Sequence, residues 1–114
     1  MLPSSAIAKL QKNRNKEYSE LLKLFQAVSD PVRFGILELL EDHATLCVTE
    51  IARVFKISVP AASHQLKILE SSGILKRERM GQMKCYVIAK DNVRVKSIVQ
   101  LMTKGRVMRG KNRK

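Results

Sequence analysis

The stretch KISVPAASHQLKILESSG, residues 56–73, has the caps and the periodicity of one amphipathic helix. Ser58 suits the N-cap, Pro60 is tolerated in a first turn, and Gly73 suits the position just past a helix end. On a helical wheel one side is apolar and would face a core. That side consists of Ala62, Leu66 and Leu69. The sequence therefore predicts a helix over residues 59–71 with one buried and one exposed side.

The exposed side of this helix is rich in short or flexible hydrogen-bonding groups. A short helix ending at Val54 or Phe55 and a three-residue connection, 55–57, come before it. This is the order of a helix-turn-helix, whose second helix enters the DNA major groove by its N-terminal half. We expect DNA contacts from Ser58, Pro60, Ala61, Ser63, His64, Gln65 and Lys67. His64 and Gln65 suit base edges, whereas lysine and serine suit phosphates. An ordinary polar helix face remains the alternative.

A basic hairpin is predicted directly after this helix. Two extended runs, 74–80 and 83–89, flank Gly81–Gln82, which is the pattern of two strands joined by a tight turn. The residues expected to contact DNA there are Lys76, Arg77, Arg79, Gln82 and Lys84. A basic two-stranded wing beside a recognition helix is the winged form of the motif. The alternative is a generic exposed hairpin whose lysines prevent edge pairing.

The remaining chain is predicted to be helical. One helix is expected from about Leu10 to Val28, and the next begins at Pro31, with Asp30 as its N-cap. The short helix before the recognition helix follows Cys47, which with Glu50 has the spacing of a capping box. The last helix is expected to begin after Asp91 and to end at Gly105.

The predicted fold class is mainly α with a small β-hairpin. It is a winged helix-turn-helix with about five helices plus a two-stranded wing over residues 75–87. Residues 1–9 are expected to be a flexible N-terminal segment and residues 105–114 a basic flexible tail. Residues 10–104 would then form the DNA-binding and dimerisation domain.

The charge of the chain favours a polyanionic partner. Its 114 residues have a net charge of +12, and ten of the 22 Lys and Arg residues lie in two acid-free segments, 9–16 and 104–114. Such basic segments are typical of nucleic-acid binding, although solvated ends are the alternative. No apolar run approaches the roughly 18–20 residues of a membrane span, and no secretory signal is visible. We therefore expect a cytoplasmic protein with double-stranded DNA as partner and no membrane association.

The motifs together resemble a known family. LFQAVSDPVRFGILELL, followed by LCVTEIARVFKISVPAASHQLKILESSGILKRERMGQMKCYV, is similar to the ArsR/SmtB (arsenic-repressor) family over about residues 20–103. The resemblance implies a homodimer that binds a palindromic operator as a repressor and that often leaves DNA when a metal or an oxidant arrives. It also implies dimerisation through the first and last helices. The interface residues would be Tyr18, Leu21, Leu22, Phe25, Val95, Ile98, Val99 and Met102, although these stripes suit an intrachain core equally well.

The family's metal sites are not matched in full. The pattern LCVC of the arsenic- and lead-type site reads here Leu46-Cys47-Val48-Thr49, so that Cys47 matches and Thr49 does not. The zinc-type site needs acids and histidines on the last helix, where residues 91–104 contain only Asp91. His43 and Cys47 are weak candidates for a metal pair. We expect no cofactor, an unknown effector, and two cysteines, Cys47 and Cys85, that pack or cap rather than form a disulfide framework, with a redox role for either thiol as the less favoured alternative.

Other function classes are less well supported by the sequence. An enzyme would need a nucleophile or base placed by partners, and the two histidines offer no such arrangement. An architectural protein that binds DNA largely without sequence preference is the main alternative, because the basic segments favour it. The hydrogen-bonding groups of the helix at 59–71 favour a sequence-specific transcriptional regulator instead.

Overall fold

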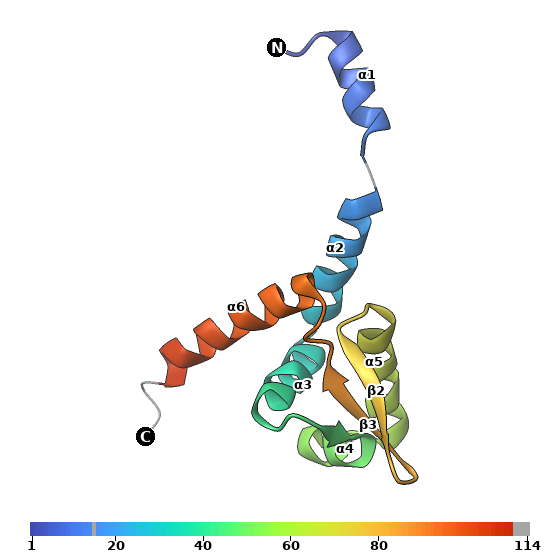
Figure 1. The fold of residues 1–114 in the computed structure, drawn as a ribbon, viewed down its shortest axis with the longest axis vertical. Helices are drawn as coiled ribbons and strands as arrows, with labels where there is room; N and C mark the ends of the chain where they lie inside the picture. The colour runs from blue at the N-terminus through green and yellow to red at the C-terminus, as the bar shows by residue number, and fades with distance from the viewer. Residues whose placement is uncertain (15, 111–114) are drawn as a thin grey trace.

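The computed structural model describes the backbone of residues 1–14 and 16–110, and the side chains of residues 1–14 and 20–105. Within these residues six helices and three strands follow one another (Figure 1). They are α1 (Ser4–Lys12), α2 (Lys16–Val28), α3 (Pro31–Asp42), β1 (Leu46–Cys47), α4 (Val48–Phe55), α5 (Val59–Ser71), β2 (Leu75–Met80), β3 (Met83–Ile88) and α6 (Val93–Gly110). None of the described helices has an apolar stretch long enough to cross a bilayer.

The strands form one antiparallel sheet in the order β1-β3-β2. β2 and β3 pair along their whole length around the turn at Gly81, whose φ of +65° favours glycine. β1 contributes two residues at the other edge, with Leu46 opposite Tyr86 and Cys47 opposite Cys85. Figure 1 shows that α4, α5 and the wing lie at one end of the molecule, while α6 runs out past α3. The predicted hairpin is confirmed, and β1 is an addition to it.

One hydrophobic core joins the helices to the sheet. Ile36 and Leu37 of α3, Ile51 of α4 and Leu66 and Leu69 of α5 are all fully buried within it. α4 packs on α5 across the connection at Lys56, which takes a left-handed φ of +55° to make the sharp turn. The buried side predicted for the recognition helix is thus confirmed, and its other side is left free.

The predicted caps explain where the central helices begin and end. The Asp30 carboxylate accepts hydrogen bonds from the backbone N–H groups of Val32 (3.0 Å) and Arg33 (3.1 Å), which fixes the first turn of α3. The Ser58 hydroxyl accepts one from Ala61 N–H at 3.1 Å in the same way at α5. Gly73 follows α5 with a φ of +90°, a conformation that ends a helix at low cost only for glycine. The helix-turn-helix boundaries predicted from the sequence are therefore confirmed.

The two ends of the chain differ from the prediction. A helix was predicted to begin only near Leu10, whereas residues 4–12 are helical because Ala6, Ala8 and Leu10 favour helix. The expected helix 10–28 is therefore two helices, α1 and α2. Figure 1 shows α1 beyond the end of α2, away from the core, and α1 has no buried residue.

The last helix also differs at both ends. Asn92, not Asp91, is its N-cap, since the Asn92 side chain accepts hydrogen bonds from the N–H groups of Arg94 (2.9 Å) and Val95 (3.2 Å). Gly105 does not end the helix, which continues to Gly110. A glycine within a helix costs only about 1 kcal/mol, and the lysine and arginine beside it are good helix formers. The expected flexible tail over 105–114 is thus helical as far as residue 110, and residues 111–114 lie outside the described part.

Candidate nucleic-acid interface

The free side of α5 presents the residues that were expected to contact DNA. Pro60, Ala61, His64 and Lys67 are exposed, and Ser63 is half-buried. The slim first turn, made of proline and alanine, leaves the N-terminal end of α5 unobstructed. Ser58 uses its hydroxyl oxygen to cap the helix, but its O–H is still able to donate to a phosphate. This side of α5 therefore has the size and the donors that a major-groove reader needs.

Gln65 is held by an arginine that sequence reasoning did not connect with it. Arg33 Nη1 donates to the Gln65 side-chain oxygen at 2.8 Å, and Arg33 Nε donates to the Ala27 carbonyl at 2.7 Å. The arginine thereby ties α5 to the end of α2. The oxygen of Gln65 is occupied, so this residue would approach a base edge mainly through its NH₂ group.

The five wing residues fall into two groups. Lys76 is paired with Asp91 (Nζ to Oδ2, 2.8 Å), and this hydrogen bond lowers the pKa of the Asp91 carboxyl. Arg77 is paired with Glu70 of α5, with the shorter contacts at 3.3 Å. Both cations thus already have an acidic partner within the chain.

The second group forms what we call the wing tip, residues Arg79, Gln82 and Lys84. Arg79 and Lys84 are cross-strand partners beside the Gly81 turn, and both are exposed. Neither side chain forms an ion pair with an acid among the described residues. The wing tip is therefore the part of the hairpin whose positive charge is available to a phosphate backbone.

A groove lies between α2, α3 and the recognition helix α5. It has a volume of about 420 Å³, and the side chains that line it include three cations and a histidine: Lys23, Arg33, Lys67 and His64. Lys23 lies on α2 and is exposed. The basic surface thus continues from α5 onto α2, a continuation that no local motif in the sequence indicated.

One exposed residue of α5 was missed. Val59, at the first helical position, is 46% exposed although it is apolar. An apolar group at the groove end of a recognition helix suits the methyl group of thymine. No clear signal for it is present in the sequence, since on the helical wheel residue 59 lies about 20° from the buried Leu66, and its exposure arises because it stands at the free N-terminal end of α5.

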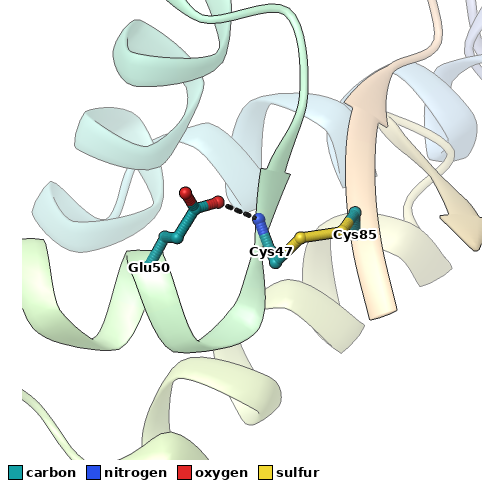
Figure 2. Close-up of a disulfide and its surroundings, with 3 residues drawn as sticks. All are labelled: Cys47, Glu50 and Cys85. Atoms are coloured by element: carbon teal, nitrogen blue, oxygen red, sulfur yellow. Dashed lines mark hydrogen bonds between the residues drawn. A yellow bond between two sulfur atoms is a disulfide. The ribbon is translucent and has the colours of Figure 1, made fainter. Parts of the chain in front are cut away.

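The prediction for the cysteines is wrong. Cys47 and Cys85 are joined by a disulfide bond, as Figure 2 shows. The pairing arises because β1 lies beside β3 with these two residues directly opposite each other, their Cα atoms 3.9 Å apart. Glu50 does bind back to the helix start as expected, accepting a hydrogen bond from Cys47 N–H at 2.9 Å (Figure 2).

The disulfide also affects the weak metal candidates. The Cys47 sulfur is bonded to Cys85 and is not a free thiolate, and His43 is an exposed residue that follows α3. In the part of the chain that the structure describes, no group of three or more His, Cys, Asp or Glu residues is placed to hold a metal ion. The donor set of a thiolate metal site is therefore incomplete here.

The expected dimer residues separate into a buried and an exposed set. Val95, Val99 and Met102 lie in the chain's own core, which is the intrachain alternative. Leu21 and Ile98 are half-buried, whereas Leu22 is 55% and Phe25 50% exposed. The side chain of Tyr18 lies outside the described residues.

An apolar groove of about 420 Å³ lies between α2, α3 and α6. It is lined by Phe25, Val28, Phe34, Glu38, Ile98, Leu101, Met102 and Gly105. Leu101, which was not among the expected residues, is 66% exposed. An apolar surface that joins the exposed parts of both expected stripes is a candidate interface between two copies of the chain.

Known proteins are similar to this chain in sequence and in fold. The sequence pattern described as bacterial regulatory protein, arsR family, matches residues 30–77. The chain is 37% identical over 87 residues to an uncharacterized HTH-type transcriptional regulator of Methanocaldococcus jannaschii, a match that covers 76% of this chain and 96% of the relative.

Two solved structures are similar to this chain in fold. The transcriptional repressor PagR of Bacillus anthracis has a TM-score of 0.65 at 28% identity, over 75% of this chain and 95% of that one. A homodimeric winged helix-turn-helix DNA-binding domain from Mycobacterium bovis, described as a possible ArsR-family transcriptional regulator, has a TM-score of 0.66 at 21% identity, over 100% and 93%. The second likeness, at this identity, concerns the fold.

Proposed function

Because this chain belongs to the arsR family of bacterial regulatory proteins, we propose that it represses transcription by binding a palindromic operator as a homodimer. The family places it among winged helix-turn-helix transcriptional regulators, not enzymes. The observation that carries the proposal is the arrangement of α5 and the wing tip. The hydrogen-bonding side of α5 is free, and the wing, whose strand β2 contacts α5, carries Arg79 and Lys84, two cations without an acid partner among the described residues.

The first two turns of α5 would make the contacts to the bases. His64 is exposed and carries ring nitrogens that can donate to or accept from a base edge. Ser63 lies on one flank, and Val59 offers an apolar contact at the groove end. Arg33 fixes the rotamer of Gln65, so that its NH₂ group meets the groove in one orientation. A fixed set of donors is what direct readout in the major groove requires.

Cations on either side of α5 would bind the phosphate backbone. The wing tip contributes Arg79 and Lys84, and the basic groove contributes Lys67 and Lys23. These contacts fix the register of the protein on the duplex but do not read its sequence. Binding that rests on several such contacts weakens steeply as salt is raised.

The apolar groove between α2, α3 and α6 supports the dimer. Its exposed members Phe25 and Leu101 come from the first and last long helices of the domain. The homodimeric domain from M. bovis shares this fold. Two copies related by a two-fold axis would present two recognition helices to successive major grooves, which predicts a palindromic site. Repression agrees with the role of the similar protein PagR, which is a transcriptional repressor. We place this activity in the cytoplasm, where the DNA is.

The alternative is an architectural protein with little sequence preference. The acid-free segments 9–16 and 104–114 favour it, because they add charge without base-reading groups. The two functions differ in the ratio of affinities for a preferred site and for random DNA at physiological salt.

The test is selection of DNA from a random pool by the purified protein. We expect an enriched palindrome with half-sites about one helical turn, roughly 10 base pairs, apart. Anisotropy titrations then compare this site with a shuffled duplex of the same composition. An unenriched pool, with equal affinity for both duplexes, would contradict the proposal and support the architectural alternative.

A further inference from the structure

The side chain of Gln65 is held from outside the recognition helix. Its oxygen accepts a hydrogen bond from Arg33 Nη1 at 2.8 Å, and Arg33 lies in the first turn of α3, 32 residues earlier in the chain. A guanidinium has only N–H donors and no acceptor, so the atom of the Gln65 amide that faces it is the oxygen. The amide therefore has one orientation, with its oxygen toward α3.

Arg33 is itself fixed by the end of α2. Its Nε donates to the Ala27 carbonyl at 2.7 Å, and its Nη2 donates at the longer distance of 3.5 Å to the Gln26 carbonyl. Both carbonyls belong to the last turn of α2. The guanidinium thus has a place of its own between α2 and α5, and its positive charge stays beside the Gln65 oxygen.

The NH₂ group of Gln65 is the part of the amide that is left for DNA. Gln65 is half-buried in the second turn of α5, one helical turn beyond the exposed Ala61, whose side chain is a single methyl group. Side chains of a helix lean toward its N-terminus, which is the end of α5 that we propose to enter the major groove. No acceptor among the described residues binds this NH₂ group, so Gln65 presents N–H donors alone.

A free glutamine and a glutamine whose oxygen is bound suit different bases. A free glutamine reads adenine with two hydrogen bonds, since its oxygen accepts from N6–H₂ while its NH₂ group donates to N7. With the oxygen bound to Arg33 the first of these bonds is lost, and the nearby positive charge repels the amino groups of adenine and cytosine. Guanine presents two acceptors in the major groove, O6 and N7, and thymine presents one, O4. Donors beside a positive charge therefore suit guanine best.

We propose that Arg33 is a positioning residue that determines sequence specificity, because by holding the Gln65 oxygen it makes Gln65 read guanine in place of adenine. The inference rests on the proposed sequence-specific DNA binding, and it adds the base that is read and the residue that selects it. Arg33 acts through Gln65, from a helix that precedes both helices of the helix-turn-helix.

The first experiment compares bases with the native protein and with Gln65→Ala. In the duplex selected from the random pool, each base pair is replaced in both half-sites by the other three, and anisotropy gives the affinities. The position at which Gln65→Ala loses discrimination is the one that Gln65 reads. We expect the native protein to bind guanine there at least about fivefold more tightly than adenine, the lower end for one good base contact. A preference for any other base, or no position that responds to Gln65→Ala, would overturn the inference.

The second experiment removes the guanidinium. Arg33→Met keeps a long unbranched side chain without a donor, so the Gln65 oxygen becomes free to accept from adenine. We expect the ratio of the guanine to the adenine affinity to fall to about one or below. If Arg33 only stabilised the fold, its loss would weaken binding to both duplexes equally and leave the ratio unchanged. Arg53→Met, at an exposed arginine on α4, is the matched control and should keep the native ratio.

The outcomes separate this inference from the proposed function. Thermal unfolding shows whether Arg33→Met is folded at the assay temperature, and the comparison of bases with the native protein tests the inference without that variant. An unchanged ratio in folded Arg33→Met would overturn the role of Arg33 and leave the proposed function intact. A random pool from which the native protein enriches no duplex would overturn both.

Discussion

Among the side chains outside the apolar core, Arg33 is the one whose replacement we expect to lower the free energy of unfolding most. Its guanidinium donates to the carbonyl of Ala27 at 2.7 Å, to the side-chain oxygen of Gln65 at 2.8 Å, and at the longer distance of 3.5 Å to the carbonyl of Gln26. One planar group therefore binds the end of α2 and the middle of α5 from its place in the first turn of α3. Lysine keeps the charge but cannot reproduce this fork.

The loss of stability on removing the Arg33 guanidinium follows from its two short hydrogen bonds, to Ala27 and to Gln65. A hydrogen bond that involves a charged group contributes about 1.5–3 kcal/mol, and Arg33 is half-buried, which favours the lower end of that range. We expect Arg33→Ala to lower the free energy of unfolding by about 2–3 kcal/mol, because two acceptors lose their donor. For a chain of 114 residues this is a fall in Tm of about 10 °C. Arg33→Lys should lose about half as much, since an ammonium reaches one acceptor.

Denaturant unfolding of Arg33→Lys, Arg33→Ala and the native protein measures these differences. Arg53→Lys on α4 is the matched control, because Arg53 is exposed and has no hydrogen bond or ion pair among the described residues, so its change should stay within about 0.5 kcal/mol. A double-mutant cycle with Gln65→Ala isolates the contact to α5 and should give a coupling of at least about 0.5 kcal/mol. If Arg33→Lys is as stable as the native protein, the fork does not hold α5 and the reasoning is refuted.

Four further outcomes are expected. His64→Ala should cost about 1–3 kcal/mol on the selected site and leave random-DNA affinity unchanged in anisotropy titrations, whereas an equal loss on both would make His64 a phosphate contact. Arg79→Ala should lower the salt slope by about one, and Arg77→Ala by clearly less because Glu70 already neutralises it; equal slopes would contradict this division of the wing. Phe25→Glu should give a monomer in light scattering, because it places a charge in the proposed dimer interface. Val54→Glu, at a similarly exposed apolar position on α4, should leave the dimer intact. A dimeric Phe25→Glu would exclude the apolar groove as the interface. Zinc, lead or arsenite at micromolar levels should not release the protein from DNA; one metal per protomer in elemental analysis, absent from Cys47→Ser, would show that Cys47 is a ligand.

The central motif was predictable because its signals are local. The core side of α5 repeats at helical spacing, and Ser58, Pro60 and Gly73 each mark a boundary by their own backbone preferences. The wing was predictable for the same reason, since a glycine turn separates two extended runs. These elements need no information from distant parts of the chain.

The missed features depend on contacts between distant residues. β1 has two residues, too few for any periodicity, and only its pairing with β3 brings Cys47 opposite Cys85. Likewise the neutralisation of Lys76 by Asp91, 15 residues away, cannot be read from a basic run. α1 was missed for a different reason, because it has no buried residue and so shows no apolar side that faces a core, which leaves helix propensity as its signal.

The distribution of charge shows why DNA binding would depend on the position of the wing relative to α5 and not on the net charge alone. The chain carries +12, but ten of its cations lie in the two acid-free segments, outside the proposed contact surface. On that surface two of the four wing cations are already paired with acids. Few free cations remain, and each contributes fully only when it meets its phosphate while α5 lies in the groove. The packing of α5 on β2 and the Cys47–Cys85 disulfide, which joins the start of α4 to β3, hold the wing beside the helix-turn-helix, and this is the arrangement that the proposed phosphate contacts need.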